Sequence, residues 1–298
     1  MKVLSFGSLN IDTVYHVDHI VMPGETISSE SVQTNCGGKG LNQSIALAKA
    51  GMEVWHAGMV GEDGNILFQA LEAAGVKTSL IRRIKEKSGN AVIQVEKGGQ
   101  NSIVLYGGAN CCIDSAYVDE VLKNFEAGDI LVIQNEISSL EYLIHQASER
   151  KMEICFNPSP MDAQLQSFDY SVISMLLLNE VEGRQITGET ESGKILEVLE
   201  KRFTDTKIVL TLGSEGAVFS CKGARQYQAV FPVKVIDTTA AGDTFTGYFI
   251  SEYYRSKNIV HALKTAACAA AIAVSRAGAA SSIPLHHEVI EQMEERGC

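Results

Sequence analysis

The sequence predicts an α/β layer fold with a mainly parallel central sheet and a small second sheet. Three observations support this prediction: recurrent short apolar runs, helical periodicity between them, and two regions of polar–apolar alternation that break the rhythm. Buried parallel strands are nearly continuous in apolar residues, and their alternation with helices favours a parallel sheet covered by helices. The apolar runs lie at residues 3–7, 54–60, 130–134, 154–156, 176–178 and 208–212.

Helical segments follow several of these runs. Residues 42–50 place Ile45 and Ala48 on one face, and Gly51 comes directly after them. Glycine adopts the left-handed conformation that ends many helices, so we expect Gly51 to close this one. Helical periodicity also marks residues 140–151 and 192–203.

Two regions of alternation predict the second sheet. Residues 13–34 alternate polar and apolar side chains around a Pro-Gly pair, and residues 91–106 alternate on both sides of a Lys-Gly-Gly-Gln turn. Alternation predicts strands with one face in water, and a glycine turn between two of them predicts a hairpin. We therefore expect one domain over residues 1–298, with a β-sheet lid formed by about 13–34 and 91–106.

The composition favours a globular protein that binds neither nucleic acid nor a membrane. Of 298 residues, 45% are hydrophobic and 20% are charged, and the formal net charge is −11. Proteins that bind duplexes normally carry a basic face, so nucleic acid is not expected as a partner. The alanine-rich segment 266–274 is shorter than the roughly 20 residues that span a bilayer, which predicts a buried helix.

The cysteines and the first residues favour a cytoplasmic location. The seven cysteines are scattered and contain no CxxC pair, which is typical of reduced thiols rather than of a zinc or redox motif. Residues 1–7 become polar too quickly to form a signal peptide.

A glycine-rich segment at residues 37–42, with the sequence GGKGLN, joins an extended segment to a helix. Glycines allow backbone amides to approach a ligand closely, and Lys39 and Asn42 would add polar side chains at the helix start. A turn that merely enters a helix is an equally good interpretation. The spacing is neither GxxxxGK[ST] nor GxGxxG, which argues against a Walker A loop and against a Rossmann dehydrogenase.

A second segment, residues 237–243 with the sequence DTTAAGD, precedes a helical pattern that begins at Thr244. Small residues before a helix leave free N–H groups, which together with the helix dipole form an anion site. A carboxylate at Asp243 could accept the proton of a hydroxyl group that attacks phosphorus. Asp243 could instead be a helix N-cap, although capping leaves the preceding Ala-Ala-Gly run unexplained.

Together these two segments resemble the PfkB/ribokinase family of carbohydrate kinases, and the resemblance covers nearly the whole chain. The first family signature fits Gly37, Gly38, Asn42, Ser44, Gly51 and Gly61. The second fits residues 237–247, followed by Tyr248 where the family usually has a small residue. The resemblance implies a ribokinase-like three-layer α/β/α domain that uses ATP to phosphorylate a sugar hydroxyl.

The resemblance also implies roles for individual residues. Those that would hold the sugar hydroxyls are Asn10, Asp12, Gly38, Lys39, Asn42, Glu136 and Asp243. Asp243 would be the catalytic base, and the amides that stabilise the transferred phosphoryl group would be those of Ala240, Ala241, Gly242 and Asp243. The nucleotide would lie against Asn179, Thr211, Gly213, Gly216 and Gly242.

Two cations are implied as well. Glu182, in an Asn-x-x-Glu motif, would hold Mg²⁺ through water, and K⁺ would lie near Asp237, Thr239, Gly278 and Ser282. Ordinary roles remain open for several of these residues. Asn10 and Asp12 would suit a turn, Glu136 and Glu182 would suit the surface, and Thr211 would suit a strand.

The expected acceptor is the primary hydroxyl of D-ribose or a close furanose. Residues 24–26, 108–110 and 157–160, together with Glu136, resemble segments of ribokinases. The implied sugar set has many hydrogen-bonding groups and no aromatic ring for a nucleoside base. Fructose, a nucleoside, a phosphorylated hexose facing Lys39, and a catalytically silent sugar-binding regulator remain alternatives. A homodimer joined lid to lid is expected, because the lid strands have exposed edges and an apolar face.

Overall fold

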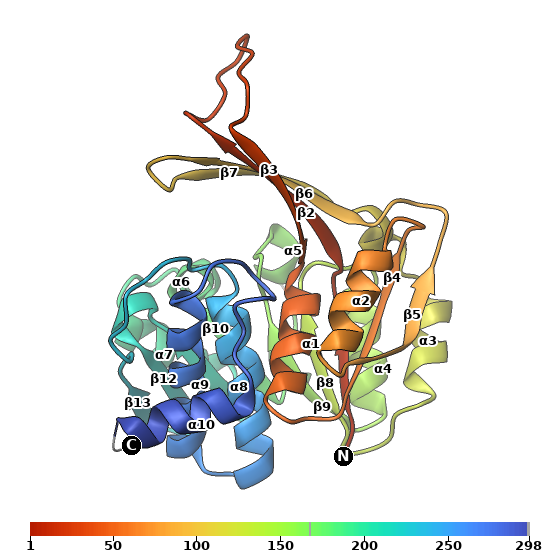
Figure 1. Cartoon of the computed structure of the whole chain (residues 1–298). Coiled ribbons are helices and arrows are strands. Elements are labelled where there is room, and N and C mark those ends of the chain that lie inside the picture. Colours follow the sequence, from red (N-terminus) through yellow and green to blue (C-terminus); the bar gives the residue numbers. More distant parts are fainter. Residues whose placement is uncertain (167, 297–298) are drawn as a thin grey trace.

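Nine strands form the central sheet of the computed structural model, which describes residues 1–166 and 168–296 (Figure 1). Their order is β13-β12-β11-β10-β9-β8-β1-β4-β5. Neighbours from β5 to β11 are parallel, and β12 and β13 add an antiparallel edge. The bounds are β1 Val3–Phe6, β4 Val54–Val60, β5 Lys77–Arg83, β8 Ile130–Gln134, β9 Glu153–Asn157, β10 Met175–Asn179, β11 Lys207–Thr211, β12 Ala217–Cys221 and β13 Ala224–Gln228.

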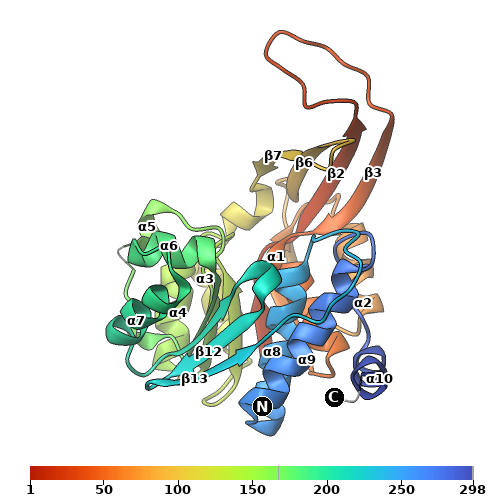
Figure 2. The same cartoon turned by 90° about the vertical axis from the view of Figure 1, so that its left-hand side faces the viewer.

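The central strands face a hydrophobic core on each side of the sheet. In β8, Ile130 and Val132 belong to one core, whereas Leu131 and Ile133 belong to the other, because successive side chains of a strand point to opposite faces. Helices cover both cores, so the predicted three-layer α/β/α fold is confirmed (Figure 2).

The helices divide between the two faces. The first core is covered by α1 Lys39–Lys49, α2 Asn65–Ala73, α8 Ala241–Ser256, α9 Ile259–Val274 and α10 His286–Glu295. The second is covered by α3 Ser115–Leu122, α4 Leu140–Glu149, α6 Glu180–Thr187 and α7 Ser192–Arg202. The short elements are α5 Ala163–Gln166, η1 Gly108–Cys112, η2 Tyr170–Val172 and η3 Gly213–Glu215.

Two neighbouring helices, α1 and α8, meet in backbone contact. Gly247 of α8 faces Ala46 and Leu47 of α1, and a Cβ atom at Gly247 would collide with both. A glycine at this position lets the two helices approach more closely than any other residue would. The contact fixes the amino ends of α1 and α8 relative to each other.

A second sheet stands away from the central one at the top of the molecule (Figure 1). Its order is β3-β2-β6-β7, with β2 and β6 parallel and the other pairs antiparallel. The bounds are β2 Asn10–Val17, β3 Ser31–Gly37, β6 Gly89–Glu96 and β7 Asn101–Tyr106. Residues 18–30, around the Pro-Gly pair, contain no strand and form a long connection (Figure 2).

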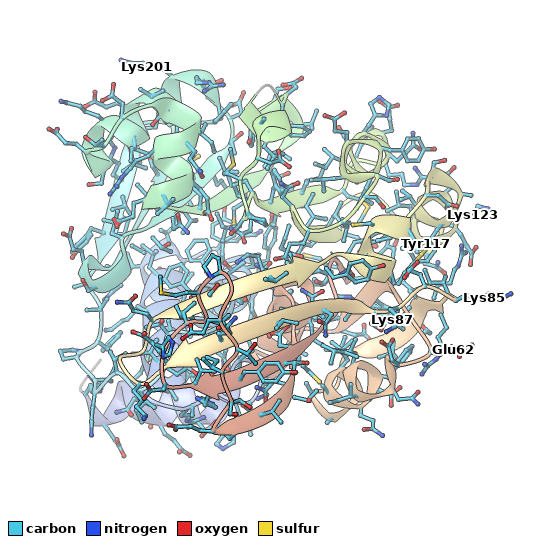
Figure 3. The ribbon with its side chains drawn as sticks, turned by 90° about the horizontal axis from the view of Figure 1, so that it is seen from above. Glu62, Lys85, Lys87, Tyr117, Lys123 and Lys201 are labelled. Atoms are coloured by element: carbon cyan, nitrogen blue, oxygen red, sulfur yellow. The ribbon has the colours of Figure 1, made fainter. Side chains whose placement is uncertain are left out.

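Parts of this second sheet are apolar and exposed. Val32, Ile103 and Val104 are 56%, 55% and 67% exposed. Figure 3 views the sheet from above, with Lys85 and Lys87 on the segment that leads from β5 into β6.

The predicted central strands and helices are confirmed, with changes at their ends. α1 begins at Lys39 rather than at residue 42, and α8 begins at Ala241 rather than at Thr244. The small residues in these first turns carry no apolar periodicity, so the pattern begins too late. Gly51 follows α1 with a φ of 93°, as predicted.

The predicted buried helix at 266–274 is the second half of α9. Within the described part of the chain, no helix is long and apolar enough to cross a membrane. The six cysteines in that part are free thiols.

Candidate active site

The candidate site lies where the carboxyl ends of parallel strands meet the amino ends of α1 and α8. Ligands of open parallel sheets bind at this edge. A cavity of about 640 Å³ is lined by residues that follow β1 and β8, including Asn10 and Glu136. A cavity of about 250 Å³ is lined by the ends of β9, β10 and β11 and by the first turn of α8.

The glycine-rich turn before α1 packs against the backbone that leaves β1. A Cβ atom at Gly40 would collide with the backbone of Gly7 and Ser8, and one at Gly38 would lie 3.0 Å from the Ser8 carbonyl oxygen. Gly38 also has a φ of 92°, which disfavours any side chain. The glycines therefore have a packing role, and this packing brings Lys39 and Asn42 to the site.

The Asp243 carboxylate lies at the centre of the site and is only 7% exposed. Its Oδ2 accepts a hydrogen bond from Asn42 Nδ2 at 3.0 Å, and its Oδ1 accepts one from Gln43 Nε2 at 2.9 Å. Both donors come from α1, so the contact between α1 and α8 determines where this carboxylate sits.

The amino end of α8 has no side-chain cap. Its N-cap residue is Ala240, with a φ of 58°, so the alternative role of Asp243 as N-cap is wrong. Within the described residues, the backbone N–H groups of Gly242 and Asp243 donate no hydrogen bond. A Cβ atom at Gly242 would meet nothing within 4 Å. Free amides that face open space at a helix start can bind an anion.

The smaller cavity brings together many of the residues predicted to contact phosphate and nucleotide. These are Lys39, Asn179, Glu182, Thr211, Ala240, Ala241, Gly242 and Asp243. Gly213 and Gly216 are not among the lining residues. They lie at the turn after β11, where a Cβ atom at Gly216 would collide with the Gln228 carbonyl oxygen.

Asn179 and Glu182 form a capping box at the start of α6. Asn179 Oδ1 accepts hydrogen bonds from the N–H groups of Val181 and Glu182, at 2.8 and 3.0 Å. The Glu182 carboxylate accepts from the backbone N–H and side-chain amide of Asn179, at 2.8 and 3.0 Å. Glu182 is 5% exposed, so its interpretation as a surface carboxylate is wrong.

Glu136 follows β8 and binds the segments that flank the sugar side of the site. Its Oε2 accepts hydrogen bonds from the Ser8 hydroxyl and, at 3.0 Å, from the Lys39 backbone N–H. Burial raises the pKa of Glu136 above its ordinary value, although the hydrogen bond from Ser8 and the charge of Lys39 oppose this rise. The interpretation of Glu136 as an ordinary surface carboxylate is therefore wrong.

Asn10 and Asp12 lie near the start of β2. Asn10 Oδ1 accepts a hydrogen bond from Asn110 Nδ2 at 2.8 Å, and Asn110 is held in turn by the Leu9 backbone N–H at 3.0 Å. Burial, followed by the nearby Glu136 carboxylate, raises the pKa of Asp12 to about 6.

Several polar atoms here have no partner within the described structure. The buried Oδ1 of Asn42 has no partner. Asp12 is half-buried, and its carboxylate accepts no hydrogen bond from a described side chain. Unpaired buried acceptors cost free energy unless a ligand or water satisfies them. A ligand rich in hydroxyl groups would satisfy both.

Lys39 is the basic side chain of the smaller cavity, and acidic groups surround it. Burial alone would lower the pKa of Lys39, but three carboxylates outweigh burial and raise it above its ordinary value. They belong to Asp243, Glu136 and Glu182. Lys39 is therefore charged at neutral pH, and its charge is already balanced by the protein.

Three of the four residues predicted around K⁺ are joined by hydrogen bonds. Asp237 Oδ1 accepts from the Thr239 backbone N–H at 2.9 Å and hydroxyl at 2.6 Å, and its Oδ2 accepts from the Gly278 N–H at 2.9 Å. Partial burial favours a higher pKa for Asp237, but these hydrogen bonds outweigh it and the pKa is lowered. The buried Ser282 hydroxyl donates instead to the Ala279 carbonyl oxygen at 2.8 Å.

Sequence reasoning missed Gln43, which contacts Asp243, and the side-chain contact of Asn110 with Asn10. Asn110 lies in the segment 108–110 that resembles ribokinases, so a signal for it was present. Gln43 directly follows Asn42 in α1, but successive helix residues do not face the same side, so no local pattern indicated that both would contact Asp243. Tyr142 lines the larger cavity, so one aromatic ring does lie near the sugar set.

A buried carboxylate beside free helix amides, at the carboxyl edge of a parallel sheet, is the arrangement of a small-molecule kinase. The comparisons with known proteins lead to the same class. The sequence profile described as pfkB family carbohydrate kinase matches residues 1–286, so the chain belongs to this family and is a carbohydrate kinase.

Within the family, the chain is similar to ribokinases. The ribokinase of Haemophilus influenzae is 35% identical over 299 residues, which cover 97% of each protein. The structure of ribokinase from Cryptococcus neoformans var. grubii serotype A, in complex with ADP, has a TM-score of 0.84 and 35% identity, and the match covers 98% of this chain and 99% of that one. Arabidopsis thaliana ribokinase, complexed with ribose and ATP, has a TM-score of 0.87 and 29% identity, with 98% of both chains covered.

Proposed function

We propose that this protein transfers the terminal phosphoryl group of ATP to the primary hydroxyl of D-ribose, giving ribose 5-phosphate and ADP. The observation that carries the proposal is the Asp243 carboxylate, which lies beside the unpaired amides of Gly242 and Asp243. Full-length similarity to ribokinases, one of them solved with ribose and ATP, supports the choice of substrate.

The reaction divides between residues that hold the sugar and residues that stabilise charge. Asn10, Asp12 and Glu136 would hold hydroxyl groups, together with Gly38, Lys39 and Asn42. Asp243 accepts the proton of the primary hydroxyl as its oxygen bonds to the terminal phosphorus, and the bond from that phosphorus to the bridging oxygen of ADP breaks. The amides of Gly242 and Asp243, with that of Ala240, would stabilise the charge on the transferred group. The Ala241 amide, which the sequence also implies for this role, donates instead to the Thr238 carbonyl oxygen at 3.2 Å.

The nucleotide would occupy the smaller cavity and the surface beside it. Asn179 and Thr211 line that cavity. Gly213 and Gly216 would shape the loop that borders the nucleotide rather than contact its phosphates. The two glycines therefore have a different role in the proposal from the one that the sequence implies.

The residues at the start of α6 fit a Mg²⁺ ion that they would hold through water molecules. Both carboxylate oxygens of Glu182 accept hydrogen bonds from Asn179, which hold the carboxylate in place. Its remaining lone pairs would orient water around the ion. No cluster of three or more His, Cys, Asp or Glu side chains that could hold a metal occurs in the described ranges. Mg²⁺ would neutralise charge on the nucleotide phosphates when bound.

The Asp237 segment fits a monovalent cation. Its ionised carboxylate and the neighbouring Thr239 hydroxyl are hard oxygen ligands, which suit K⁺. Such an ion would hold the segment from Asp237 to Ala240 in shape when bound. We expect K⁺ to raise kcat over Na⁺ or choline at equal ionic strength, and equal rates in all three salts would contradict this assignment.

The second sheet is proposed to act as a lid and as the dimer interface. Its strands carry the exposed side chains of Val32, Ile103 and Val104, and Leu105 is 53% exposed while lining the larger cavity. Ile103 and Leu105 lie on one face of β7 and Val104 lies on the other, so a second copy packed lid to lid would cover one of these faces. Light scattering at micromolar concentration should give the mass of a dimer, and a monomer would count against this interface. The cytoplasmic location stays a prediction.

The structure favours a neutral sugar over a sugar phosphate. Because Lys39 is balanced by three carboxylates, little positive charge is left for a second phosphate. Of the two alternative acceptors, a nucleoside is better supported than a sugar phosphate. Tyr142 lines the larger cavity, and its aromatic ring could stack on a base.

The decisive experiment is ATP consumption against a panel of pentoses, hexoses, nucleosides and sugar phosphates. Ribose should give the highest kcat/KM. A much higher value for a nucleoside or a phosphorylated hexose would overturn the substrate but not the kinase. Sugar binding without any turnover would indicate a silent regulator.

A further inference from the structure

We propose that Gln43 is a positioning residue that orients the catalytic carboxylate through a chain of buried side-chain amides. The inference rests on the proposed role of Asp243 as base. Gln43 lies in α1, and its side chain is fully buried. It is not among the residues that would touch sugar or nucleotide, and no packing argument requires a polar group at this place.

The amide group of Gln43 joins three partners. Its Nε2 donates to Asp243 Oδ1 at 2.9 Å and to Asn157 Oδ1 at 3.2 Å, and its Oε1 accepts from Gln134 Nε2 at 2.7 Å. Both hydrogens of the amide nitrogen are therefore used. Asn157 and Gln134 are the last residues of β9 and β8, so two rigid strand ends hold the amide that meets the base.

The hydrogen-bond donors and acceptors around these side-chain amides allow only one orientation of each amide. Asn157 Nδ2 donates to the Leu177 carbonyl oxygen at 2.8 Å, and a carbonyl oxygen can only accept. Asn157 must then present Oδ1 to Gln43, which must present its amide nitrogen to both Asn157 and Asp243. Reversal of any one amide would set two donors or two acceptors against each other, so the network fixes where Oδ1 of Asp243 points.

The far end of the chain packs against the turn that follows β1. Gln134 Oε1 is buried without a described partner and fills the space that a Cβ atom of Gly7 would occupy. This close contact limits where the Gln134 side chain can lie and helps to hold its amide nitrogen on Gln43.

The two amides that meet Asp243 have different tasks. Asn42 Nδ2 contacts Oδ2, and its own Oδ1 is free for a ligand. Gln43 has no free polar atom, so it can act on the reaction only through the carboxylate. The charged groups that also act on this region are Lys39, Glu136 and Glu182, and none of them is hydrogen-bonded to Gln43.

The test compares two variants with the same chemical change. Gln43→Met removes the amide that contacts Asp243 while keeping a side chain of similar volume. Gln134→Met removes an amide of the same chain that contacts Gln43 but not Asp243. We expect Gln43→Met to lower kcat at least tenfold while the KM for ribose changes less than threefold. Gln134→Met, which loosens Gln43 without touching Asp243, should lower kcat by a smaller factor. No loss of kcat in Gln43→Met, or a larger loss in Gln134→Met than in Gln43→Met, would overturn the proposal.

A third variant gives a readout that packing alone would not move. Gln43→Glu keeps the shape but places a carboxylate 2.9 Å from Asp243 Oδ1, where two negative charges cannot both persist without raising a pKa. The acidic limb of the kcat–pH profile should move upward by one pH unit or more. An unshifted limb in a folded, active Gln43→Glu enzyme would contradict the role.

Asp243→Asn, measured in parallel, separates this inference from the function on which it rests. An inactive Asp243→Asn together with a normal Gln43→Met would overturn the positioning role alone. An active Asp243→Asn would overturn both the base and the residue proposed to orient it. Thermal unfolding of all variants shows whether any loss of activity follows from loss of folding.

Discussion

Two helices, α6 and α8, begin at the same edge of the central sheet and border the same cavity, yet their amino ends differ. α6 begins with a complete capping box, in which Asn179 and Glu182 satisfy each other's backbone and side-chain groups. α8 begins with Ala240 in a left-handed conformation, and the amides of Gly242 and Asp243 stay unpaired.

This difference shows how one sheet edge can serve both stability and catalysis. Side-chain caps stabilise a helix because they satisfy N–H groups that the helix cannot. The same N–H groups are useful to a ligand only when nothing in the protein occupies them. α6 therefore uses its first turn for folding, and α8 keeps its first turn available for an anion.

The largest expected effect tests the base at the open helix end. Asp243→Asn should lower kcat by about 10²–10⁴-fold, because a general base typically contributes that much. The side chain keeps its size, so sugar binding and cooperative unfolding should persist. Steady-state kinetics and calorimetric titration with ribose check both parts, and a near-normal kcat would remove Asp243 from its role.

The open end can also be blocked sterically. Gly242→Val would extend a side chain into space where a Cβ atom meets nothing within 4 Å, so folding should be little affected. The side chain would keep phosphate away from the free amides and lower kcat by roughly 10²-fold, as when one oxyanion donor is removed. Unchanged kinetics in a folded variant would mean that the phosphoryl group lies elsewhere.

The same contrast applies to two carboxylates. Both oxygens of Glu182 accept hydrogen bonds, whereas the Asp12 carboxylate accepts none from a described side chain. Asp12→Asn should raise the KM for ribose by about tenfold at pH 7.5, as expected for loss of a hydrogen bond to a charged group. The pKa of Asp12 is raised to about 6, so the difference from wild type should shrink below that pH. KM profiles between pH 5 and 8 test this, and a pH-independent ratio would contradict it.

Asp12→Asn should also change the stability of the protein, and the raised pKa of Asp12 determines the sign of that change. In the folded protein Asp12 holds its proton up to about pH 6, whereas its ordinary pKa is 3.8. The raised pKa therefore adds to the free energy of unfolding in full below pH 3.8, and this contribution is lost as the pH rises through 6. Without ligand, Asp12→Asn should increase the free energy of unfolding at pH 7.5 by no more than about 2 kcal/mol, and not at pH 3.5.

The smallest effect concerns the capped helix. Asn179→Ala should lower the free energy of unfolding by about 1 kcal/mol, the usual value of an N-cap side chain. Urea denaturation without nucleotide measures this loss, and Gly242→Val serves as the control that loses turnover instead. Equal stability of Asn179→Ala and wild type would remove the contrast between the two helix ends.

The sequence predicts the central strands and the three-layer fold because buried strands are continuous apolar runs. The prediction omits β12, a short apolar strand with the sequence AVFSC. It also does not reveal β5 or β13, whose sequences KTSLIRR and ARQYQ carry charged and polar side chains at the two edges of the sheet. Edge strands are exposed on one side and lack the apolar pattern on which the prediction rests. The capping role of Glu182 was visible in the spacing Asn-x-x-Glu, which is a recognised helix start.

Some of the residues that contact Asp243 could be predicted from the sequence, and one could not. Asn42 and Asp243 were predicted from motifs, and the structure brings them into contact. Gln43 was missed because its partners come from Gln134 and Asn157, at the ends of two different strands. Contacts between residues so far apart in the chain follow from the sheet order, which no local pattern contains.

The crossing between the two sheets has a consequence for how affinity should be understood. The chain leaves the central sheet through Ser8 and returns through Gly38, and these two crossings touch, with Gly38 packed on the Ser8 carbonyl. Two further segments, residues 84–88 and 107, also join the small sheet to the rest of the chain. The residues next to the first two crossings, Asn10 and Lys39, are among those proposed to meet the sugar. If the small sheet closes over the sugar by bending at these crossings, a measured sugar dissociation constant would include the free energy of closure together with that of the contacts.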